Sequence, residues 1–340
     1  MSNEGIRKAV RERYGQRAKA GTSCCGTSKS CCGSGTSSAS QAIGYAEEQL
    51  NAIPRGADLG LGCGNPTALA SSKEGEPVLD LGSGAGIDCF LAAQAVGPNG
   101  CAIGIDMTAE MIERARENAL ENGIENVEFR LGEVEHLPVP DGSVDVVISN
   151  CVVNLSPDRP QVILDAFRAL KPGGRMYLSD IVLLKALPEE IRESIEAYVG
   201  CVAGASMKAD YLAAIEAAGF EDVAVLKETS ADSAFSDPTE AKILIDGAEV
   251  DPEKLALDPE RVHQLADTIS NITVKAVKRS WRQRRKGDEV EAYQPSRTSD
   301  LTVHSSSRSS STITPIPDPF GTVIVPSEFN LNGGSMRSRS

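Results

Sequence analysis

An acidic residue followed by three alternating glycines lies within residues 78–88, VLDLGSGAGID. The apolar residues around Asp80 predict a short strand, and the residues after Gly86 predict a helix. Glycine at positions 82, 84 and 86 permits a tight turn and close approach of a ligand, because no Cβ stands in the way. The positive end of the helix dipole and the first N–H groups of the helix point at this turn. The spacing therefore predicts a binding site for a cofactor that contains a nucleotide.

Two acids near the turn help to distinguish a dinucleotide from S-adenosylmethionine. Asp80 comes just before the glycines, where it would repel a pyrophosphate and attract the ammonium group of a methionine moiety. Asp106 follows about 20 residues later at the end of a second predicted strand, where a carboxylate can accept hydrogen bonds from ribose hydroxyls. A glycine-rich turn alone also occurs in dinucleotide enzymes. The segment after Gly86 has no arrangement aimed at two phosphates, so the two acids favour S-adenosylmethionine.

Nine cysteines give the chain a second kind of chemistry. Cys63 lies before the first predicted strand, Cys151 follows the fourth, and Cys201 lies in a helical segment after the fifth. Because ligands bind at the carboxyl edge of a parallel sheet, these three thiols can converge on one soft, three-coordinate centre. No histidine or carboxylate cluster has metal-ligand spacing, so no resident metal ion is predicted. Cys89 and Cys101 are predicted to be small buried apolar residues.

Four further cysteines form two adjacent pairs in residues 23–33, SCCGTSKSCCG. This Ser- and Gly-rich composition cannot form a packed element, so it predicts a mobile loop. Adjacent pairs suit tetrahedral zinc poorly compared with Cys-x-x-Cys. The first residues lack the apolar core of a signal peptide, and we therefore expect cysteines that are reduced, reactive or metal-binding rather than a disulfide framework. The four are Cys24, Cys25, Cys31 and Cys32.

Alternating strands and helices are predicted to position these residues. Besides the strand before the glycine turn, strands are predicted over residues 101–106, 127–131, 144–149, 175–180, 220–227 and 271–277, the last antiparallel to its neighbour. Helices are predicted over 5–19, 40–50, 87–96, 108–122 with Thr108 as N-cap, 159–170, 188–201 and 208–218, and a helix or turn over 67–72. Residues 171–174, KPGG, predict a turn. This order predicts an α/β fold with a doubly wound, mostly parallel sheet of the seven-stranded type and small helical insertions on the substrate side.

Composition excludes several classes of partner. The net charge of −14 argues against a general nucleic-acid binder, which needs clustered Lys and Arg. No apolar run approaches the roughly 20 residues of a membrane helix. A hydrophobic content of 41% is sufficient for a packed core. We therefore expect a cytoplasmic monomer that contacts neither nucleic acid nor membrane.

Four regions are predicted along the 340 residues. Residues 1–57 contain the N-terminal helices and the cysteine-rich loop, and residues 58–230 form the Rossmann-like core with the isolated cysteines. Residues 231–278 are an acidic insertion, with one helix near 260–268, and the last strand. Residues 279–340 are a basic, Ser-rich tail that is expected to be disordered. The basic residues at its start predict a solvated junction, with a nuclear-import or anionic-surface signal as the alternative.

Three segments together resemble the class I S-adenosylmethionine-dependent methyltransferases: residues 78–86, 104–107 and 170–174. The resemblance implies that the acid and glycine turn hold the methionine moiety and ribose, and that the acid after the second strand binds ribose. Residues after the third strand would cover the adenine amine, and those after the fourth would face the methyl group. The implied cofactor residues are Asp80, Gly82, Ser83, Gly84, Gly86, Asp106, Met107 (packing on adenine), Glu133, Val134 and Asn150.

The sequence around the isolated cysteines resembles a particular family of methyltransferases. Residues 60–66 (GLGCGNP), 149–155 (SNCVVNL) and 200–205 (GCVAGA) resemble the arsenite methyltransferases, as do residues 11–15 (RERYG) followed by a cysteine-rich loop. The resemblance extends over residues 10–227 and 272–278.

This resemblance implies that Cys63, Cys151 and Cys201 bind trivalent arsenic, which arrives as a thiol conjugate of arsenite and is detoxified by methylation. It also implies that one of the N-terminal cysteines relays arsenic or forms a disulfide with the substrate cysteines. Spacing does not show which of Cys24, Cys25, Cys31 and Cys32 has this role. A loop that only scavenges arsenic or metal is an alternative of equal weight to an essential relay. Thioredoxin or glutathione would serve as the reductant.

Two other functions stay open. A methyltransferase for a small organic substrate, such as a quinone or sterol ring carbon, would keep its activity when thiols are blocked. A protein that only sequesters metalloids by its cysteines would not bind S-adenosylmethionine.

Overall fold

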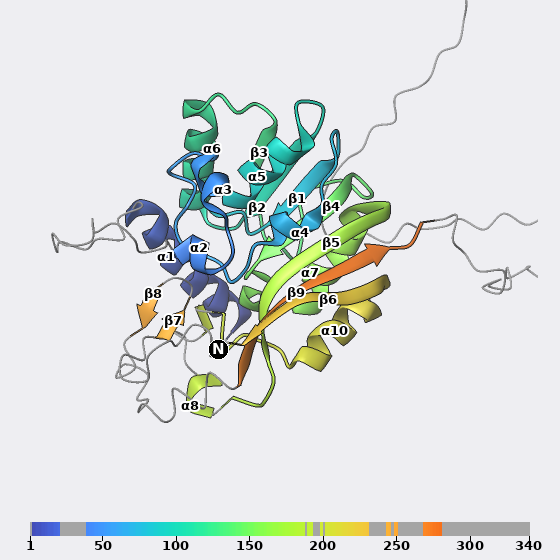
Figure 1. Cartoon of the computed structure of the whole chain (residues 1–340). Helices are drawn as coiled ribbons and strands as arrows, with labels where there is room; N and C mark the ends of the chain where they lie inside the picture. Colours follow the sequence, from blue (N-terminus) through green and yellow to red (C-terminus); the bar gives the residue numbers. More distant parts are fainter. Residues whose placement is uncertain are drawn as a thin grey trace, which may run out of the picture. The chain divides into compact units, whose positions relative to one another are not determined.

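Seven strands form the main sheet of the computed structural model. They are β1 (Pro77–Leu81), β2 (Cys101–Asp106), β3 (Val127–Leu131), β4 (Val144–Asn150), β5 (Leu170–Leu183), β6 (Phe220–Ser230) and β9 (Ile269–Lys278). Their order is β3-β2-β1-β4-β5-β9-β6 (Figure 1), and β9 is antiparallel to both of its neighbours. The other pairs in the sheet are parallel. The predicted seven-stranded, mostly parallel α/β sheet is confirmed.

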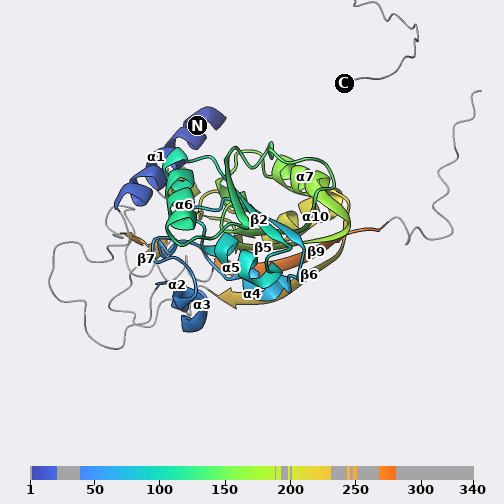
Figure 2. The ribbon, with the colours of Figure 1, turned by 90° about the horizontal axis from the view of Figure 1, so that it is seen from above.

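The structure describes residues 2–20, 39–187, 189–192, 198–199, 201–230, 243–245, 248–250 and 268–280, all within one compact unit, Met1–Asp288. Its helices are α1 (Asn3–Ala20), α2 (Ala39–Ala42), α3 (Glu47–Asn51), α4 (Pro66–Ala70), α5 (Ile87–Val96), α6 (Ala109–Glu121), the 3₁₀ turn η1 (Val153–Leu155), α7 (Arg159–Ala169), α8 (Glu189–Arg192) and α10 (Lys208–Ala217). Seen from above, α7 and α10 cover one face of the sheet, and α4 and α5 cover the other (Figure 2). None of the described helices has the length and apolarity needed to cross a membrane.

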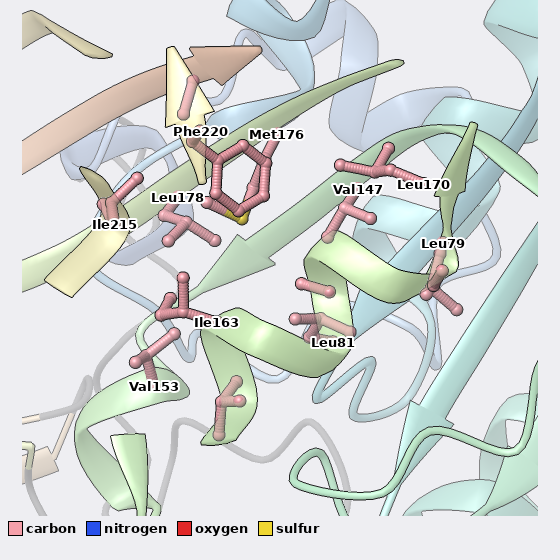
Figure 3. Packing of buried hydrophobic residues seen from close by; sticks show 14 of the residues in the cluster. Leu79, Leu81, Val147, Val153, Ile163, Leu170, Met176, Leu178, Ile215 and Phe220 are labelled. Carbon is pink, nitrogen blue, oxygen red and sulfur yellow. The ribbon is translucent and has the colours of Figure 1, made fainter. Parts of the chain in front are cut away.

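Both faces of β1 are buried, which explains its nearly continuous apolar sequence. Leu79 and Leu81 belong to one core, which extends to Ile215 of α10 (Figure 3). Val78 points to the opposite face and packs with Phe90 of α5 in a second core. The sheet is therefore covered on both sides, and ligands can reach it only beyond the strand ends, where open α/β sheets bind them.

The fifth strand differs from its prediction. It begins at Leu170 and runs through residues 171–174, which were predicted to form a turn. Val144 pairs with Leu170 and Val146 pairs with Arg175, so these four residues bulge out of the ladder opposite a single residue. Gly173 has a φ of +87°, a conformation that glycine adopts without strain. The same KPGG residues that indicate a turn therefore form a bulge within a continuing strand.

Other boundaries also shift. The helix predicted over 40–50 is two short helices, α2 and α3, and Gly44 between them has a φ of +113°. A short antiparallel pair, β7 (Ile243–Ile245) and β8 (Ala248–Val250), lies in the acidic insertion and was not predicted. Of the helix predicted over 188–201, the described parts are α8, residues 198–199 and Cys201, which lies in a turn. Residues 260–267, where another helix was predicted, lie outside the described residues. The division into four regions stays a prediction.

Candidate functional site

An open cavity lies at the carboxyl ends of β1, β2 and β4, and its space amounts to about 960 Å³ when the part open to solvent is included. Most of the residues predicted to contact a cofactor line it, namely Asp80, Gly82, Ser83, Gly84, Asp106, Met107, Val134 and Asn150. Gly86 and Glu133 lie outside this lining. Gly86 precedes α5 with a φ of +103°, and Glu133 forms ion pairs with Arg7 and Arg11 of α1.

The glycine-rich turn is fixed by the neighbouring strand. The N–H groups of Gly82 and Ser83 both donate to the carbonyl oxygen of Ile105, at 2.7 and 2.9 Å. Gly82 has a φ of +69°, and a Cβ at this position would collide with the side chain of Val152. Only glycine fits here, so the turn leaves its backbone open to a ligand in the cavity.

Asp106 holds the two segments that flank the cavity. Its carboxylate accepts hydrogen bonds from the N–H of Gly84 at 3.0 Å and from the N–H of Thr108 at 2.8 Å. Burial raises the pKa of Asp106, although these backbone hydrogen bonds lower it in part. Thr108 stands at the N-cap of α6 as predicted, but its side chain makes no capping hydrogen bond. Each oxygen of Asp106 keeps a lone pair for a ribose hydroxyl.

Two buried acids, Asp80 and Asp88, form the floor of the cavity. Asp88 accepts hydrogen bonds from the hydroxyls of Tyr45, at 2.9 Å, and of Thr67. Burial raises the pKa of both carboxyl groups, and the charge of Asp88 raises the pKa of Asp80 further. A cation in the cavity would offset this repulsion. The sulfonium and ammonium groups of S-adenosylmethionine therefore fit the residues present.

Three cysteines from three distant segments meet in one cluster, here called the thiol cluster: Cys63, Cys151 and Cys201. Cys201 Sγ donates to the carbonyl oxygen of Cys151 at 3.0 Å, and Cys63 Sγ donates to that of Ser179 at 3.5 Å. The Cys151 thiol is hydrogen-bonded to the thiols of both other cysteines. Cys151 also lines the cavity, so the thiol cluster adjoins the site predicted for the cofactor.

The backbone of the thiol cluster is held in an unusual conformation. Cys151 and Cys201 have φ values of 60° and 64°, in the left-handed region that costs a non-glycine residue roughly 1 kcal/mol or more. The N–H of Cys151 donates to the carbonyl of Ser179 at 2.7 Å. The Arg159 guanidinium donates to the carbonyl of Gly204, three residues after Cys201. These contacts stabilise the turns that present the thiols.

The surroundings of Cys151 favour the protonated form of its thiol. The hydrogen bond with Cys201 lowers the pKa of Cys151, but the hydrogen bond with Cys63 and burial raise it by more, so it lies well above its usual range. Burial also raises the pKa of the nearby Asp180 to about 7, despite a 2.7 Å hydrogen bond from the hydroxyl of Tyr211. A centre that binds the Cys151 sulfur must therefore displace its proton.

Within the described part of the chain, no three His, Cys, Asp or Glu side chains form a ready-made metal site. Cys24, Cys25, Cys31 and Cys32 lie outside the described residues. Cys89 is buried as predicted, whereas Cys101 is only half-buried.

Helix α1 covers both the cavity and the thiol cluster. Arg7, Val10 and Tyr14 line the cavity, and Val10 and Tyr14 also pack in the apolar group that contains the three cysteines. Arg7 pairs with Glu135 at 3.2 Å, and the Tyr14 hydroxyl donates to the carbonyl of Val199 at 3.3 Å. The helix was predicted, but its place over the site was not. The signal was the i, i+4 spacing of Val10 and Tyr14 on one face.

Comparison with known proteins finds a methyltransferase domain and similar arsenite methyltransferases. A family model described as a methyltransferase domain matches residues 72–219. The chain is 50% identical over 242 residues to the arsenite methyltransferase of Halobacterium salinarum, covering 69% of this chain and 62% of that protein. It is 41% identical over 174 residues to the arsenite methyltransferase of Aquipseudomonas alcaligenes, covering 49% of this chain and 50% of that protein. The chain thus spans about half to three fifths of these curated relatives.

A solved structure is also similar over most of this chain. It is an arsenic(III) S-adenosylmethionine methyltransferase from Chlamydomonas reinhardtii, with a TM-score of 0.52 and 29% sequence identity over 73% of this chain and 75% of that one. Besides the seven-stranded sheet and the cavity beside three cysteines, the chain therefore has a segment that matches a methyltransferase domain, and much of its length is similar to arsenite methyltransferases.

Proposed function

We propose that this chain transfers a methyl group from S-adenosylmethionine to trivalent arsenic bound by Cys63, Cys151 and Cys201. The observation that carries the proposal is the thiol cluster itself, because Cys151 belongs both to it and to the lining of the cavity. Thiolates prefer soft elements such as arsenic. The names of the relatives described above support the same substrate.

The cavity residues would hold the methyl donor in a fixed orientation. When bound, S-adenosylmethionine supplies a methyl group activated by its attachment to a positively charged sulfur. Asp80 and Asp88 would balance the positive charges of the methionine moiety, and Asp106 would accept the ribose hydroxyls. Met107 would pack against the adenine. Each of these residues lines the cavity.

The thiol cluster would bind and orient the arsenic. An arsenic atom carried by small thiols exchanges them for Cys63, Cys151 and Cys201, and each cysteine proton passes to a departing thiolate. The bound arsenic keeps a lone pair, which forms the bond to the methyl carbon, while the electron pair of the broken carbon–sulfur bond stays on the donor sulfur. No general base is needed, because arsenic has no proton to lose. The chain contributes an approach of about 3 to 3.5 Å and the exclusion of water.

Methyl transfer formally oxidises arsenic to the pentavalent state. Two electrons return it to the trivalent state when two cysteine thiols form a disulfide, and thioredoxin or glutathione then reduces that disulfide. One of the N-terminal cysteines would serve in this exchange or in delivery of arsenic. We further propose that the protein works as a cytoplasmic monomer.

The test uses the full chain with arsenite, labelled S-adenosylmethionine and glutathione, and separates the arsenic species by chromatography. We expect mono- and dimethylated arsenic from the native protein. Cys151→Ser and Cys201→Ser should each lower the rate at least about 100-fold, since the bound arsenic loses a ligand. Cys101→Ser is the matched control, because Cys101 lies at the start of β2, and it should keep the native rate. Absence of methylated arsenic with the native protein would contradict the proposal.

A further inference from the structure

The side chain of Asn150 connects the cavity to the segment that carries Cys63. Asn150 ends β4 and lines the cavity. Its Oδ1 accepts hydrogen bonds from the N–H of Cys63 at 3.0 Å and from the N–H of Gly64 at 3.2 Å. Its Nδ2 donates to the carbonyl of Gly64 at 2.7 Å. One amide group therefore binds the backbone on both sides of the Cys63 Cα.

The same amide is bound to the floor of the cavity. Nδ2 of Asn150 also donates to the hydroxyl of Tyr45 at 2.9 Å, and this hydroxyl donates in turn to the carboxylate of Asp88 at 2.9 Å. Nδ2 lies 3.4 Å from Oδ2 of Asp88 itself. Tyr45, Asp88 and the Asn150 amide thus form a short path of hydrogen bonds from a buried acid of the cavity to the Cys63 segment.

Packing leaves this segment little room to move independently. Gly62 has a φ of +109°, and a Cβ there would lie 2.7 Å from Nδ2 of Asn150. A Cβ on Gly64 would lie 2.8 Å from the side chain of Ser179. The backbone on either side of Cys63 is therefore closely packed between Asn150 of β4 and Ser179 of β5. We expect a shift of the Asn150 amide to shift Cys63 as well.

We propose that Asn150 is a positioning residue that binds Cys63 to the cavity floor, so that a ligand in the cavity changes the accessibility of the Cys63 thiol. The proposal rests on the proposed function in taking Cys63 as an arsenic ligand. It assigns Asn150 a second task beside the cofactor contact predicted from the sequence. Linkage requires the effect to be reciprocal, so an arsenic-bound Cys63 would alter affinity for the cavity ligand by the same factor.

The test measures the alkylation rate of each cysteine by iodoacetamide, using mass spectrometry, in the full chain without arsenic. In Asn150→Ala we expect Cys63 to react at least about tenfold faster than in the native protein, because three hydrogen bonds to its segment are lost. The rate of Cys89, which is fully buried on α5, should stay within about twofold, because local loosening leaves α5 intact. An unchanged Cys63 rate, or a parallel rise at Cys89, would overturn the proposal.

Asn126→Ala is the matched control for loss of an asparagine that ties backbone segments together. Asn126 Nδ2 donates to the carbonyls of Ala93 at 2.9 Å and Gly97 at 3.0 Å, and neither belongs to the cavity lining described above. This variant should react at Cys63 at the native rate. A rise equal to that of Asn150→Ala would show that any lost asparagine loosens the protein, and would overturn the assignment.

Saturating S-adenosylhomocysteine, with binding verified by calorimetry for each variant, tests the coupling. It should slow alkylation of Cys63 at least about threefold in the native protein and have little effect in Asn150→Ala. Tyr45→Phe keeps the amide contacts to the Cys63 segment but removes the hydroxyl link, and should show a reduced response. Slowing that persists fully in both variants would mean that the ligand simply blocks Cys63, which would overturn the coupling. Because no arsenic is present, these results do not depend on whether arsenic is methylated.

Discussion

Cys151 combines the two halves of the site in one residue, since its thiol belongs to the thiol cluster and also lines the cavity. Its pKa lies well above the usual range because the contact with Cys63 and burial outweigh the opposing effect of Cys201. Reactivity of a cysteine follows the thiolate fraction. We therefore predict that iodoacetamide alkylates Cys151 at pH 7.5 at least about tenfold more slowly than free cysteine, as measured by mass spectrometry of the peptide. A rate near that of free cysteine would contradict this assignment of the protonated state.

Asp180 makes stability depend on pH. Its pKa is raised to about 7 by burial, so the folded protein holds this proton more tightly than the unfolded chain does. The contribution of Asp180 to the free energy of unfolding is therefore complete below about pH 4 and is lost as the pH rises through about 7. Asp180→Asn removes the titration and keeps an acceptor for Tyr211. The Tm of this variant minus that of the native protein should be at least about 3 °C larger at pH 8 than at pH 5. Equal differences at both pH values would rule out the raised pKa.

The sequence predicted which cysteines meet, but not most of the residues around them. Cys151 could be placed because it directly follows a strand of the parallel sheet, whereas Cys63 and Cys201 were assigned to the same site mainly through the resemblance to arsenite methyltransferases. Asp88 and Tyr45 could not be found in this way. Their contacts depend on how α5 and the segment before α3 pack side chains under the cavity, and single-sequence patterns carry no signal for such tertiary contacts.

At the scale of elements, Arg7 binds α1 to the residues that follow β3. Its guanidinium pairs with Glu135, whose side chain is only 4% exposed, and with Glu133. Removing one partner of a buried ion pair leaves the other charge uncompensated. Arg7→Met should therefore weaken S-adenosylhomocysteine binding by about tenfold or more, measured by calorimetry. Lys8→Met is the control, because Lys8 is 70% exposed and pairs within α1 with Glu12, and it should bind as the native protein does.

Elements with strong hydrophobic periodicity were predicted well. The errors occurred where the same residues are typical of two different local structures. Apolar runs indicated central strands such as β1 and β4, because burial on both faces demands such runs, and alternation indicated β9. The KPGG residues indicated a turn, yet they form a bulge in β5. A glycine with positive φ occurs in both, and only the pairing with β4, a non-local contact, decides between them.

At the scale of the whole molecule, the cavity joins segments that are far apart in the chain: α1, the glycine turn, the ends of β2 and β4, and the residues after β3. A ligand bound there stabilises the folded state, by about 2.7 kcal/mol at a concentration 100 times its Kd. S-adenosylhomocysteine should therefore raise Tm by several degrees in scanning fluorimetry. Asp106→Ala loses the carboxylate that holds both flanks of the cavity, and its Tm should not respond to the same ligand concentration. No shift in the native protein at millimolar ligand would argue against cofactor binding.

The left-handed backbone at Cys151 and Cys201 implies that the protein keeps these two thiols at some cost in stability. At most positions a protein is less stable with glycine than with alanine, but at a position with positive φ it is more stable with glycine. Cys151→Gly should consequently unfold at a higher denaturant concentration than Cys151→Ala, although both lose the thiol and with it the proposed arsenic ligand. Selection for robustness alone would favour glycine at both positions. Cysteine at these two positions is therefore expected only where the proposed binding of arsenic is in use.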